Sequence, residues 1–330
     1  MARVLVTGGA GYIGSHACKA LSRAGHEPVV YDTLESGFRE FVRWGPLEEG
    51  STLDRERLSA VIRRHKPDAV MHFAAYIAAG ESVQQPAKYY RNNTAGTLSL
   101  LEAMREAGVG RIVFSSTAAV YGNPLSTPIA EDHRLAPINP YAHSKLFVEQ
   151  ILRDFETAHG LRSVALRYFN AAGADPDGEL GECHEPETHL IPLALRAAAG
   201  GGDPLTVFGN DYDTPDGTPI RDYIHVADLA AAHVAALDHL LGGGASATAN
   251  LGVGTGYTVR EVLAAAARVL GHEVPTVEGP RRPGDPTALV ADPGLAMDLL
   301  SWRPKFTSLE SIIETAARWE TSDRRRAVRP

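Results

Sequence analysis

The sequence predicts an α/β protein in which a doubly wound parallel sheet is accompanied by a smaller mixed α/β domain. Three observations lead to this prediction. Short apolar runs alternate with helical patterns through the first half of the chain, and a glycine-rich turn separates the first run from the first helix. The chain is also 330 residues long, which suggests about two domains.

The first half supplies the strands and helices of the predicted sheet. Val4–Thr7 is a short apolar run, and the helical stretch Ser15–Arg23 follows it and ends at Gly25. Further expected strands are Pro28–Asp32, Ala69–Phe73, Arg111–Ser116 and Val164–Tyr168, and further expected helices are Leu58–His65, Thr94–Ala107 and Leu146–Ala158. Strands that alternate with helices form right-handed βαβ units and hence a parallel sheet.

The second half is less regular and is expected to hold the smaller domain. We predict a polar loop at Asp211–Thr218, a helix at Ile224–Leu241, a strand or turn at Leu251–Gly256 and a helix at Thr258–Leu270. One domain is therefore expected over residues 1–170 and the other over residues 171–330, with residues 219–250 crossing back to the first.

Composition argues against several classes of protein. The chain has 32 Lys and Arg against 40 Asp and Glu, a net charge of −8, which argues against a nucleic-acid partner. Cys18 and Cys183 are its two cysteines, and this usage suits a reducing cytoplasm rather than a disulfide framework. No apolar stretch is long enough to span a membrane. The thirteen histidines show no H-x-x-H or H-E-x-x-H spacing, so no metal is expected.

The glycine-rich turn carries the first functional signal. Gly8, Gly11 and Gly14 form a G-x-x-G-x-x-G pattern. Glycines after a first strand allow a tight turn and a close approach of a pyrophosphate to a helix N-terminus. An ordinary turn is the alternative, but the strand before it and the helix after it favour a Rossmann-type dinucleotide site.

Asp32 adds a second condition, because it ends the second expected strand, eighteen residues beyond Gly14. A carboxylate at this place accepts hydrogen bonds from a ribose and would repel a 2′-phosphate. We therefore expect NAD rather than NADP as the cofactor. The alternative is that Asp32 is a turn residue.

A helix that opens at Asn139 and Pro140 carries a candidate proton-transfer pair. Tyr141 and Lys145 share one face of it, although this spacing alone is common by chance. A tyrosine titrates near pH 10, so a base at neutral pH needs a pKa lowered by ~3 units, or ~4 kcal/mol. A nearby ammonium and a cationic nicotinamide favour the phenolate. Thr117 follows a strand at the same edge of the sheet, where open α/β sheets bind ligands.

Six segments resemble the extended short-chain dehydrogenase/reductases and, within them, the UDP-glucose 4-epimerase family. They are TGGAGYIGSH, HFAAYIAAGESV, SSTAAVYG, NPYAHSK, LRYFNAAGA and RDYIHVADLA. FGNDYDTPDGT and RRPGD separate this subgroup from other extended members. The resemblance covers Val4 to about Trp302. It implies an isomerase of galactose metabolism that forms a homodimer through the helices containing Thr94–Ala107 and Leu146–Ala158.

The resemblance also implies a mechanism that interconverts UDP-glucose and UDP-galactose with bound NAD. Tyr141, as phenolate, would take the proton of the sugar 4-hydroxyl while the 4-hydride passes to the nicotinamide, which gives a 4-keto sugar. The keto sugar would turn over, held by its UDP end, and the hydride and proton would return on the opposite face. Tyr141, Lys145 and Thr117 would be the catalytic residues.

The same resemblance assigns binding residues. Those expected to contact NAD are Gly8, Gly11, Tyr12, Ile13, Gly14, Asp32, Thr33, Leu34, Ser36, Gly37, Ser51, Thr52, Phe73, Ala74, Ala75, Ile77, Asn92, Ser115, Tyr141, Lys145 and Phe169. Those expected to contact the UDP-sugar are Thr117, Tyr141, Asn170, His189, Leu190, Thr206, Phe208, Arg221, Tyr223, Arg282, Asp285 and Leu289. The two arginines suit a diphosphate because guanidinium groups offer forked, permanently charged donors.

Three positions depart from the family pattern. Ser51 stands where an Asp usually contacts adenine, and Ile77 stands where some members carry a Lys near the cofactor phosphates. His189 stands where other members place an Asn near the substrate phosphates, and a helix-cap or surface role is its alternative. These changes could weaken NAD retention or alter the choice of substrate.

Other functions stay open. A 4-epimerase of UDP-pentoses or UDP-N-acetylhexosamines is one, because Leu289 aligns with a pocket residue whose bulk limits C2 substituents. A nucleotide-sugar 4,6-dehydratase is less favoured, since related dehydratases carry Asp-Glu where this chain has Ala118 and Ala119. A catalytically silent NAD-binding protein of the same fold is the third.

Overall fold

The computed structural model describes residues 1–200, 203–282 and 284–328 of the chain. Its largest feature is a seven-stranded parallel sheet in the order β10-β6-β5-β4-β1-β2-β3. The strands are β1 (Arg3–Thr7), β2 (Glu27–Asp32), β3 (Leu47–Glu49), β4 (Ala69–His72), β5 (Arg111–Ser115), β6 (Arg162–Tyr168) and β10 (Ala247–Leu251). Strand order changes direction between β1 and β4, as in a doubly wound, Rossmann-type fold. The predicted fold class is therefore confirmed.

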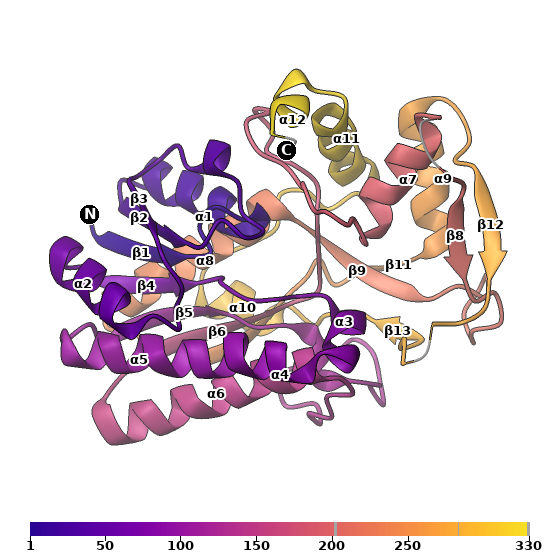
Figure 1. Cartoon of the computed structure of the whole chain (residues 1–330). Coiled ribbons are helices and arrows are strands. Elements are labelled where there is room, and N and C mark those ends of the chain that lie inside the picture. Colours follow the sequence, from indigo (N-terminus) through magenta and orange to yellow (C-terminus); the bar gives the residue numbers. More distant parts are fainter. Residues whose placement is uncertain (201–202, 283, 329–330) are drawn as a thin grey trace.

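Helices cover both faces of this sheet (Figure 1). One face carries α1 (Tyr12–Arg23) and α8 (Val226–Leu241), and the other carries α2 (Arg55–His65), α5 (Gly96–Glu106) and α6 (Pro140–His159). Successive side chains of a strand point to opposite faces. In β1, Val4 and Val6 accordingly join the core under α1 and α8, whereas Leu5 joins the core under α2 and α5. Burial on both faces explains why these strands are continuous apolar runs.

Smaller sheets form the second part of the molecule. β9 (Ile220–His225) pairs with β7 (Asn170–Ala172), β11 (Gly256–Thr258) and β13 (Ala288–Leu289), and β8 (Leu205–Phe208) pairs with β12 (Thr276–Gly279). The helices that pack around a core there are α7 (Leu190–Ala198), α9 (Val259–Leu270) and α11 (Leu309–Glu320). Figure 1 shows α7, α9, β8 and β12 at the end of the molecule remote from the N-terminus.

Short elements complete the described part of the chain. They are α3 (Ala79–Gln84), α4 (Pro86–Tyr89), α10 (Gly294–Leu299), α12 (Asp323–Ala327), the 3₁₀ turns Arg39–Phe41 and Ala118–Tyr121, and the π-helical stretch Tyr90–Ala95. Among the described residues, no helix combines the length and the apolar character that a bilayer crossing requires. The division of the chain into domains at residue 170 stays a prediction.

Two predicted helices begin two residues later than expected. The helix expected from Ile224 begins at Val226, because Ile224 and His225 pair with β7 as the end of β9. The helix expected from Thr94 begins at Gly96, where the preceding π-helical stretch ends. Apolar periodicity does not separate the end of a buried strand or a π-turn from the helix that follows it.

Candidate active site

The turn between β1 and α1 is packed so closely that two of its positions require glycine. Gly8 has a φ of +73°, and a Cβ atom there would lie 2.5 Å from the backbone nitrogen of Ala74. A Cβ atom on Gly14 would lie 2.1 Å from the carbonyl oxygen of Gly8. A larger residue at either position would separate the start of α1 from the carboxyl ends of β1 and β4.

The N-terminus of α1 is open to a ligand. The helix begins at Tyr12 rather than at Ser15, with Gly11 as its N-cap and without a side-chain cap. Its first intrahelical hydrogen bond joins the Ser15 N–H to the Gly11 carbonyl (3.0 Å), so the N–H groups of Tyr12, Ile13 and Gly14 precede that bond. Such an end attracts phosphate through its N–H groups and its dipole. The turn therefore fits the diphosphate of a dinucleotide.

Asp32 braces the same turn. Its carboxylate accepts hydrogen bonds from the N–H groups of Ala10 and Leu34, both at 2.9 Å. Burial raises the pKa of Asp32, and these backbone donors act against that shift. Because each carboxylate oxygen has a further lone pair, the group that holds the turn can also accept a ribose hydroxyl.

The other residues predicted to contact the cofactor follow the strands of the large sheet. They lie after β2 (Thr33, Leu34, Ser36, Gly37), after β3 (Ser51, Thr52), after β4 (Phe73, Ala74, Ala75, Ile77), at the end of β5 (Ser115), after β6 (Phe169) and on the π-helical stretch (Asn92). Since the strands are parallel, these residues share one edge of the sheet. The Ser51 hydroxyl accepts a hydrogen bond from the Leu53 N–H (3.2 Å), and Ile77 is exposed.

The start of α6 fixes the position of the candidate proton-transfer pair. Asn139 caps the helix by accepting a hydrogen bond from the Ala142 N–H (2.9 Å), and Pro140 occupies the first helical position. The predicted cap is thus confirmed. Tyr141 and Lys145 follow on consecutive turns of one face.

Tyr141, Lys145 and Thr117 are all buried beyond the end of β5. The Lys145 ammonium donates a hydrogen bond to the Ser115 carbonyl (2.7 Å), and the Thr117 side chain lies near enough to Tyr141 to lower the pKa of its phenol. Burial raises the pKa of Tyr141 more than the Thr117 contact lowers it, and burial lowers the pKa of Lys145 to about 7. The expected fall in the pKa of Tyr141 is therefore not produced by the chain alone. It requires a further positive charge in the site.

A buried ion pair that sequence reasoning missed lies on the same helix face. The Glu149 carboxylate accepts two hydrogen bonds from the Arg167 guanidinium, at 2.9 and 2.6 Å, and both side chains are at most 4% exposed. The Ser116 hydroxyl donates to the same carboxylate at 2.6 Å. The pair joins α6 to β5 and β6. Regular spacing along the helix from Tyr141 through Lys145 to Glu149 is the signal that could have identified it.

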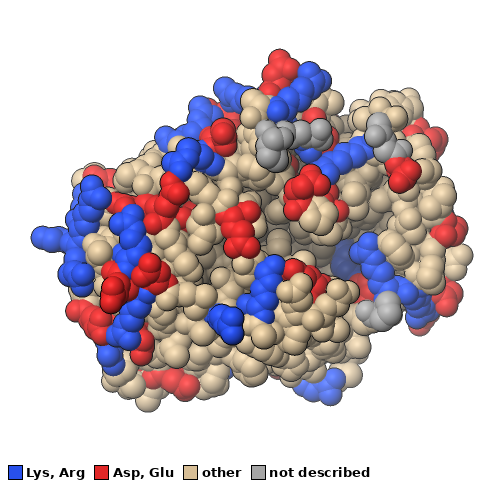
Figure 2. Space-filling view, in the orientation of Figure 1, with Lys and Arg blue, Asp and Glu red and all other residues tan. Residues whose placement is uncertain are grey.

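Apart from Thr117 and Tyr141, the residues predicted to hold the substrate lie on the second part of the molecule. Asn170 on β7 lies opposite Tyr223 on β9, and Leu289 on β13 lies opposite Arg221 on β9. The others lie on β8 (Thr206, Phe208), at the start of α7 (His189, Leu190) and before β13 (Arg282, Asp285). Figure 2 shows the face hollowed between the two parts, with acidic and basic side chains both around the hollow.

Two contacts place guanidinium groups among these residues. Arg221 forms an ion pair with Asp285, and the guanidinium of Arg282 lies 4.1 Å from the ring centroid of Phe208. Both groups retain N–H donors for an anionic ligand. His189 is the N-cap residue of α7, as the alternative for it predicted, and its side chain is 41% exposed, but the imidazole makes no capping hydrogen bond.

Comparison with known proteins reveals extensive similarity. The model of the NAD dependent epimerase/dehydratase family matches residues 4–252. The UDP-glucose 4-epimerase of Rhizobium meliloti (strain 1021) is 55% identical over 318 residues, which are 96% of this chain and 97% of that protein. The crystal structure of UDP-glucose 4-epimerase from Brucella ovis in complex with NAD has a TM-score of 0.94 and 53% identity, over 96% of this chain and 98% of that chain. UDP-glucose 4-epimerase from Bifidobacterium longum in complex with NAD+ and UDP has a TM-score of 0.92 and 39% identity, over 97% and 98%.

We predict that Glu149→Gln lowers the free energy of unfolding by about 3–5 kcal/mol, because it leaves the buried Arg167 charge without its partner. Urea denaturation measures this loss. Glu310→Gln is the matched control, since the pair of Glu310 with Arg268 is exposed and is expected to contribute about 0–1 kcal/mol. Equal, small losses in the two variants would contradict the role given to the buried pair.

Proposed function

The chain belongs to the NAD dependent epimerase/dehydratase family, and from this premise we propose that it is a 4-epimerase that interconverts UDP-glucose and UDP-galactose. One observation carries the proposal. Tyr141, Thr117 and Lys145 lie together in a buried position at the edge of the sheet where the glycine-rich turn opens. A proton acceptor beside a dinucleotide site is what oxidation of a secondary alcohol requires.

The residues present fit NAD as the cofactor. Gly8 and Gly14 leave no room for side chains, the start of α1 offers N–H groups to a diphosphate, and Asp32 can accept a ribose hydroxyl while repelling a 2′-phosphate. When bound, NAD supplies a hydride acceptor that is also positively charged. Two of the solved relatives named above hold NAD, which supports this assignment.

Tyr141 performs the proton transfer in the proposed mechanism. As phenolate it accepts the proton of the sugar 4-hydroxyl, and as phenol it returns that proton once the opposite face of the 4-keto sugar is presented. A fall of ~3 units in its pKa corresponds to ~4 kcal/mol, which must come from the charge of the cofactor together with Lys145. The Thr117 hydroxyl, next to Tyr141, orients the reacting hydroxyl.

The UDP end of the substrate is held by the second part of the molecule. Arg221 and Arg282 are assigned to the diphosphate, because two guanidinium groups offer forked donors at the edge of the small sheet. Phe208, which lies under Arg282, and Asn170, Tyr223 and Leu190 are assigned to the remainder of the nucleotide. Firm binding of the nucleotide leaves the hexose free to present either face.

The alternative functions have less support. A dehydratase needs carboxylates next to Thr117, where the 3₁₀ turn instead presents Ala118 and Ala119. A non-catalytic protein would not need the buried Tyr141 and Lys145. Activity on UDP-pentoses or UDP-N-acetylhexosamines stays an open extension of the proposal, with Leu289 as the position that limits the C2 substituent.

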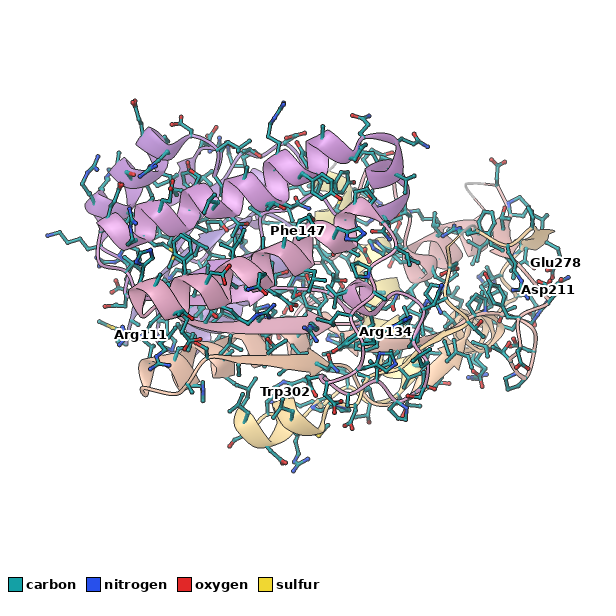
Figure 3. All side chains as sticks on the ribbon, turned by 90° about the horizontal axis from the view of Figure 1, so that it is seen from below. Arg111, Arg134, Phe147, Asp211, Glu278 and Trp302 are labelled. Atoms are coloured by element: carbon teal, nitrogen blue, oxygen red, sulfur yellow. The ribbon has the colours of Figure 1, made fainter. Side chains whose placement is uncertain are left out.

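We also propose a homodimer and a cytoplasmic location. Phe147 on α6 and Leu98 on α5 are exposed apolar side chains, 47% and 39% accessible, on two helices that pack against each other. Figure 3 shows Phe147 on α6, with α5 beside it on the face turned to the viewer. A second copy would cover this apolar face. Fractionation of cells that express the protein tests the location.

The proposed reaction is tested by incubating the NAD-loaded protein with UDP-galactose in the absence of any added oxidant. We expect UDP-glucose to form, and we expect Tyr141→Phe to lower kcat about 10²–10⁴-fold while the Kd for UDP is unchanged, because only the proton acceptor is removed. Tyr257→Phe, which removes a phenol from β11, is the matched control and should leave kcat unchanged. Unchanged sugar with the wild-type protein would refute the function, and normal turnover by Tyr141→Phe would remove that residue as the base.

The proposed dimer is tested by light scattering after size-exclusion chromatography. Phe147→Glu should convert a two-chain mass into a one-chain mass, because it would bury a charge in the interface. Leu125→Glu is the matched control, since Leu125 is exposed but lies outside α5 and α6. A one-chain mass for the wild-type protein would contradict the dimer, and an unchanged two-chain mass for Phe147→Glu would place the interface elsewhere.

A further inference from the structure

The segment between β7 and α7 brings together four side chains that commonly ligate metals. They are Glu182, His184, Glu187 and His189, and one ligand atom from each lies within 4.8 Å of all the others. Their spacing, E-x-H-x-x-E-x-H, matches neither of the two histidine spacings that guided the expectation of no metal. The backbone of an irregular segment, rather than a helix turn, brings them together.

The short N···O contacts within this cluster outnumber the N–H groups that could form hydrogen bonds along them. Nδ1 of His189 lies 2.6 Å from Oε1 of Glu182 and 3.1 Å from Oε1 of Glu187, and Nδ1 of His184 lies 3.0 Å from the same Glu182 oxygen. A ring nitrogen offers only one in-plane N–H or one lone pair, so His189 cannot make straight hydrogen bonds to both carboxylates. Ligand atoms around a tetrahedral Zn²⁺ are about 3.3 Å apart, given metal–ligand bonds of about 2.0 Å. The cluster is therefore close to the size that one small cation requires.

The carboxylates of Glu182 and Glu187 are buried, so their negative charges require nearby positive charge. The side chains of Glu182 and Glu187 are only 7% and 1% exposed. Oε2 of Glu187 is buried and accepts no hydrogen bond from any described residue, and its ion-pair partner Arg196 is 3.6 Å away. Two protonated imidazoles would balance the two carboxylates, but a divalent cation supplies the same charge and can also bind the second oxygen of Glu187. It leaves both imidazoles neutral, which is the state that ligates a metal.

A second acidic cluster provides an internal contrast. Asp175, Asp177 and Glu179 also lie within ligand distance of one another, but the Lys19 ammonium occupies their centre at 2.6, 2.8 and 2.7 Å. There the chain itself supplies the cation. Around Glu182 and Glu187, no described lysine takes this place. Apart from the imidazoles, Glu187 has only the Arg196 guanidinium among the described side chains, at 3.6 Å, and its Oε1 accepts the backbone N–H groups of Thr188 and His189 at 2.8 and 3.0 Å.

We propose that Glu182, His184, Glu187 and His189 bind one divalent ion of the zinc and cobalt class. Imidazole nitrogens combined with carboxylate oxygens suit these ions. This proposal stands without the proposed function, but it gives His189, which was expected to contact the UDP-sugar, to the ion instead. Tyr12 also borders the site: its ring contacts the His184 ring edge-on, with 6.1 Å between the centroids.

The segment that carries the four ligands contacts α1 and α11 and leads directly into α7. Tyr12 begins α1, and its hydroxyl donates a hydrogen bond to the Gly173 carbonyl after β7 (2.6 Å). The Glu182 carbonyl accepts a hydrogen bond from the indole N–H of Trp319 on α11 (3.0 Å), and His189 begins α7. Bound metal would therefore fix the segment between β7 and α7, which itself contacts α1 and α11, as a structural ion.

The test uses the full-length chain, made without a histidine tag, stripped with a chelator and then titrated with Zn²⁺ or Co²⁺ alone. We expect about one ion per chain by elemental analysis, a visible Co²⁺ spectrum of low coordination number, and a rise in Tm on addition of Zn²⁺. His184→Gln and Glu187→Gln should each weaken Zn²⁺ binding at least roughly tenfold.

Glu179→Gln is the matched control, because it alters the cluster that Lys19 already occupies, and it should bind Zn²⁺ as the wild-type protein does. Circular dichroism shows whether each variant is folded. Absence of stoichiometric binding to the wild-type protein would overturn the proposal. Equal Zn²⁺ affinity in folded His184→Gln and wild-type protein would assign any bound ion to other side chains and would overturn it as well.

Discussion

The buried ion pair between Glu149 and Arg167 is the interaction on which the candidate site depends. Two ionised side chains that are at most 4% exposed are stable only while each keeps its partner, so α6 is held against β5 and β6 in one position. Tyr141 and Lys145 share a helix face with Glu149. The Ser116 hydroxyl bonds to the same carboxylate and immediately precedes Thr117 in the chain. The Glu149–Arg167 pair thus fixes the positions of the helix and strand that carry the proton-transfer residues.

Local signals in the sequence predicted the parts of the molecule that local chemistry determines. The Asn139 cap, the glycine-rich turn and the alternating strands and helices depend on residues close together in the chain. The Glu149–Arg167 pair and the end of β9 at His225 depend on contacts between distant segments. Spacing along α6 marks Glu149, but no local pattern identifies Arg167 as its partner or separates the end of β9 from α8. The upward effect of burial on the pKa of Tyr141 is likewise not visible in the residue types near it, and the predicted fall of that pKa still depends on the charge of a bound cofactor.

Whole-chain charge is a poor guide to what the cleft binds. A net charge of −8 would disfavour phosphate-rich ligands if it were spread evenly. In the proposed site, instead, the open end of α1, Arg221 and Arg282 are the local groups assigned to phosphates, and Lys145 adds positive charge beside Tyr141. Acidic residues elsewhere are engaged in the chain's own contacts, such as those of Asp175, Asp177 and Glu179 with Lys19.

The central claim is that Tyr141 moves only the hydroxyl proton of the sugar, and that the hydrogen on C4 never exchanges with water. NMR of the product formed from UDP-galactose that carries deuterium at C4, in ordinary water and with the NAD-loaded protein, tests this claim most directly. We predict UDP-glucose that retains deuterium at C4. Product that carries a hydrogen from water at C4 would mean that a side chain removes the C4 hydrogen as a proton, and it would contradict the proposed mechanism.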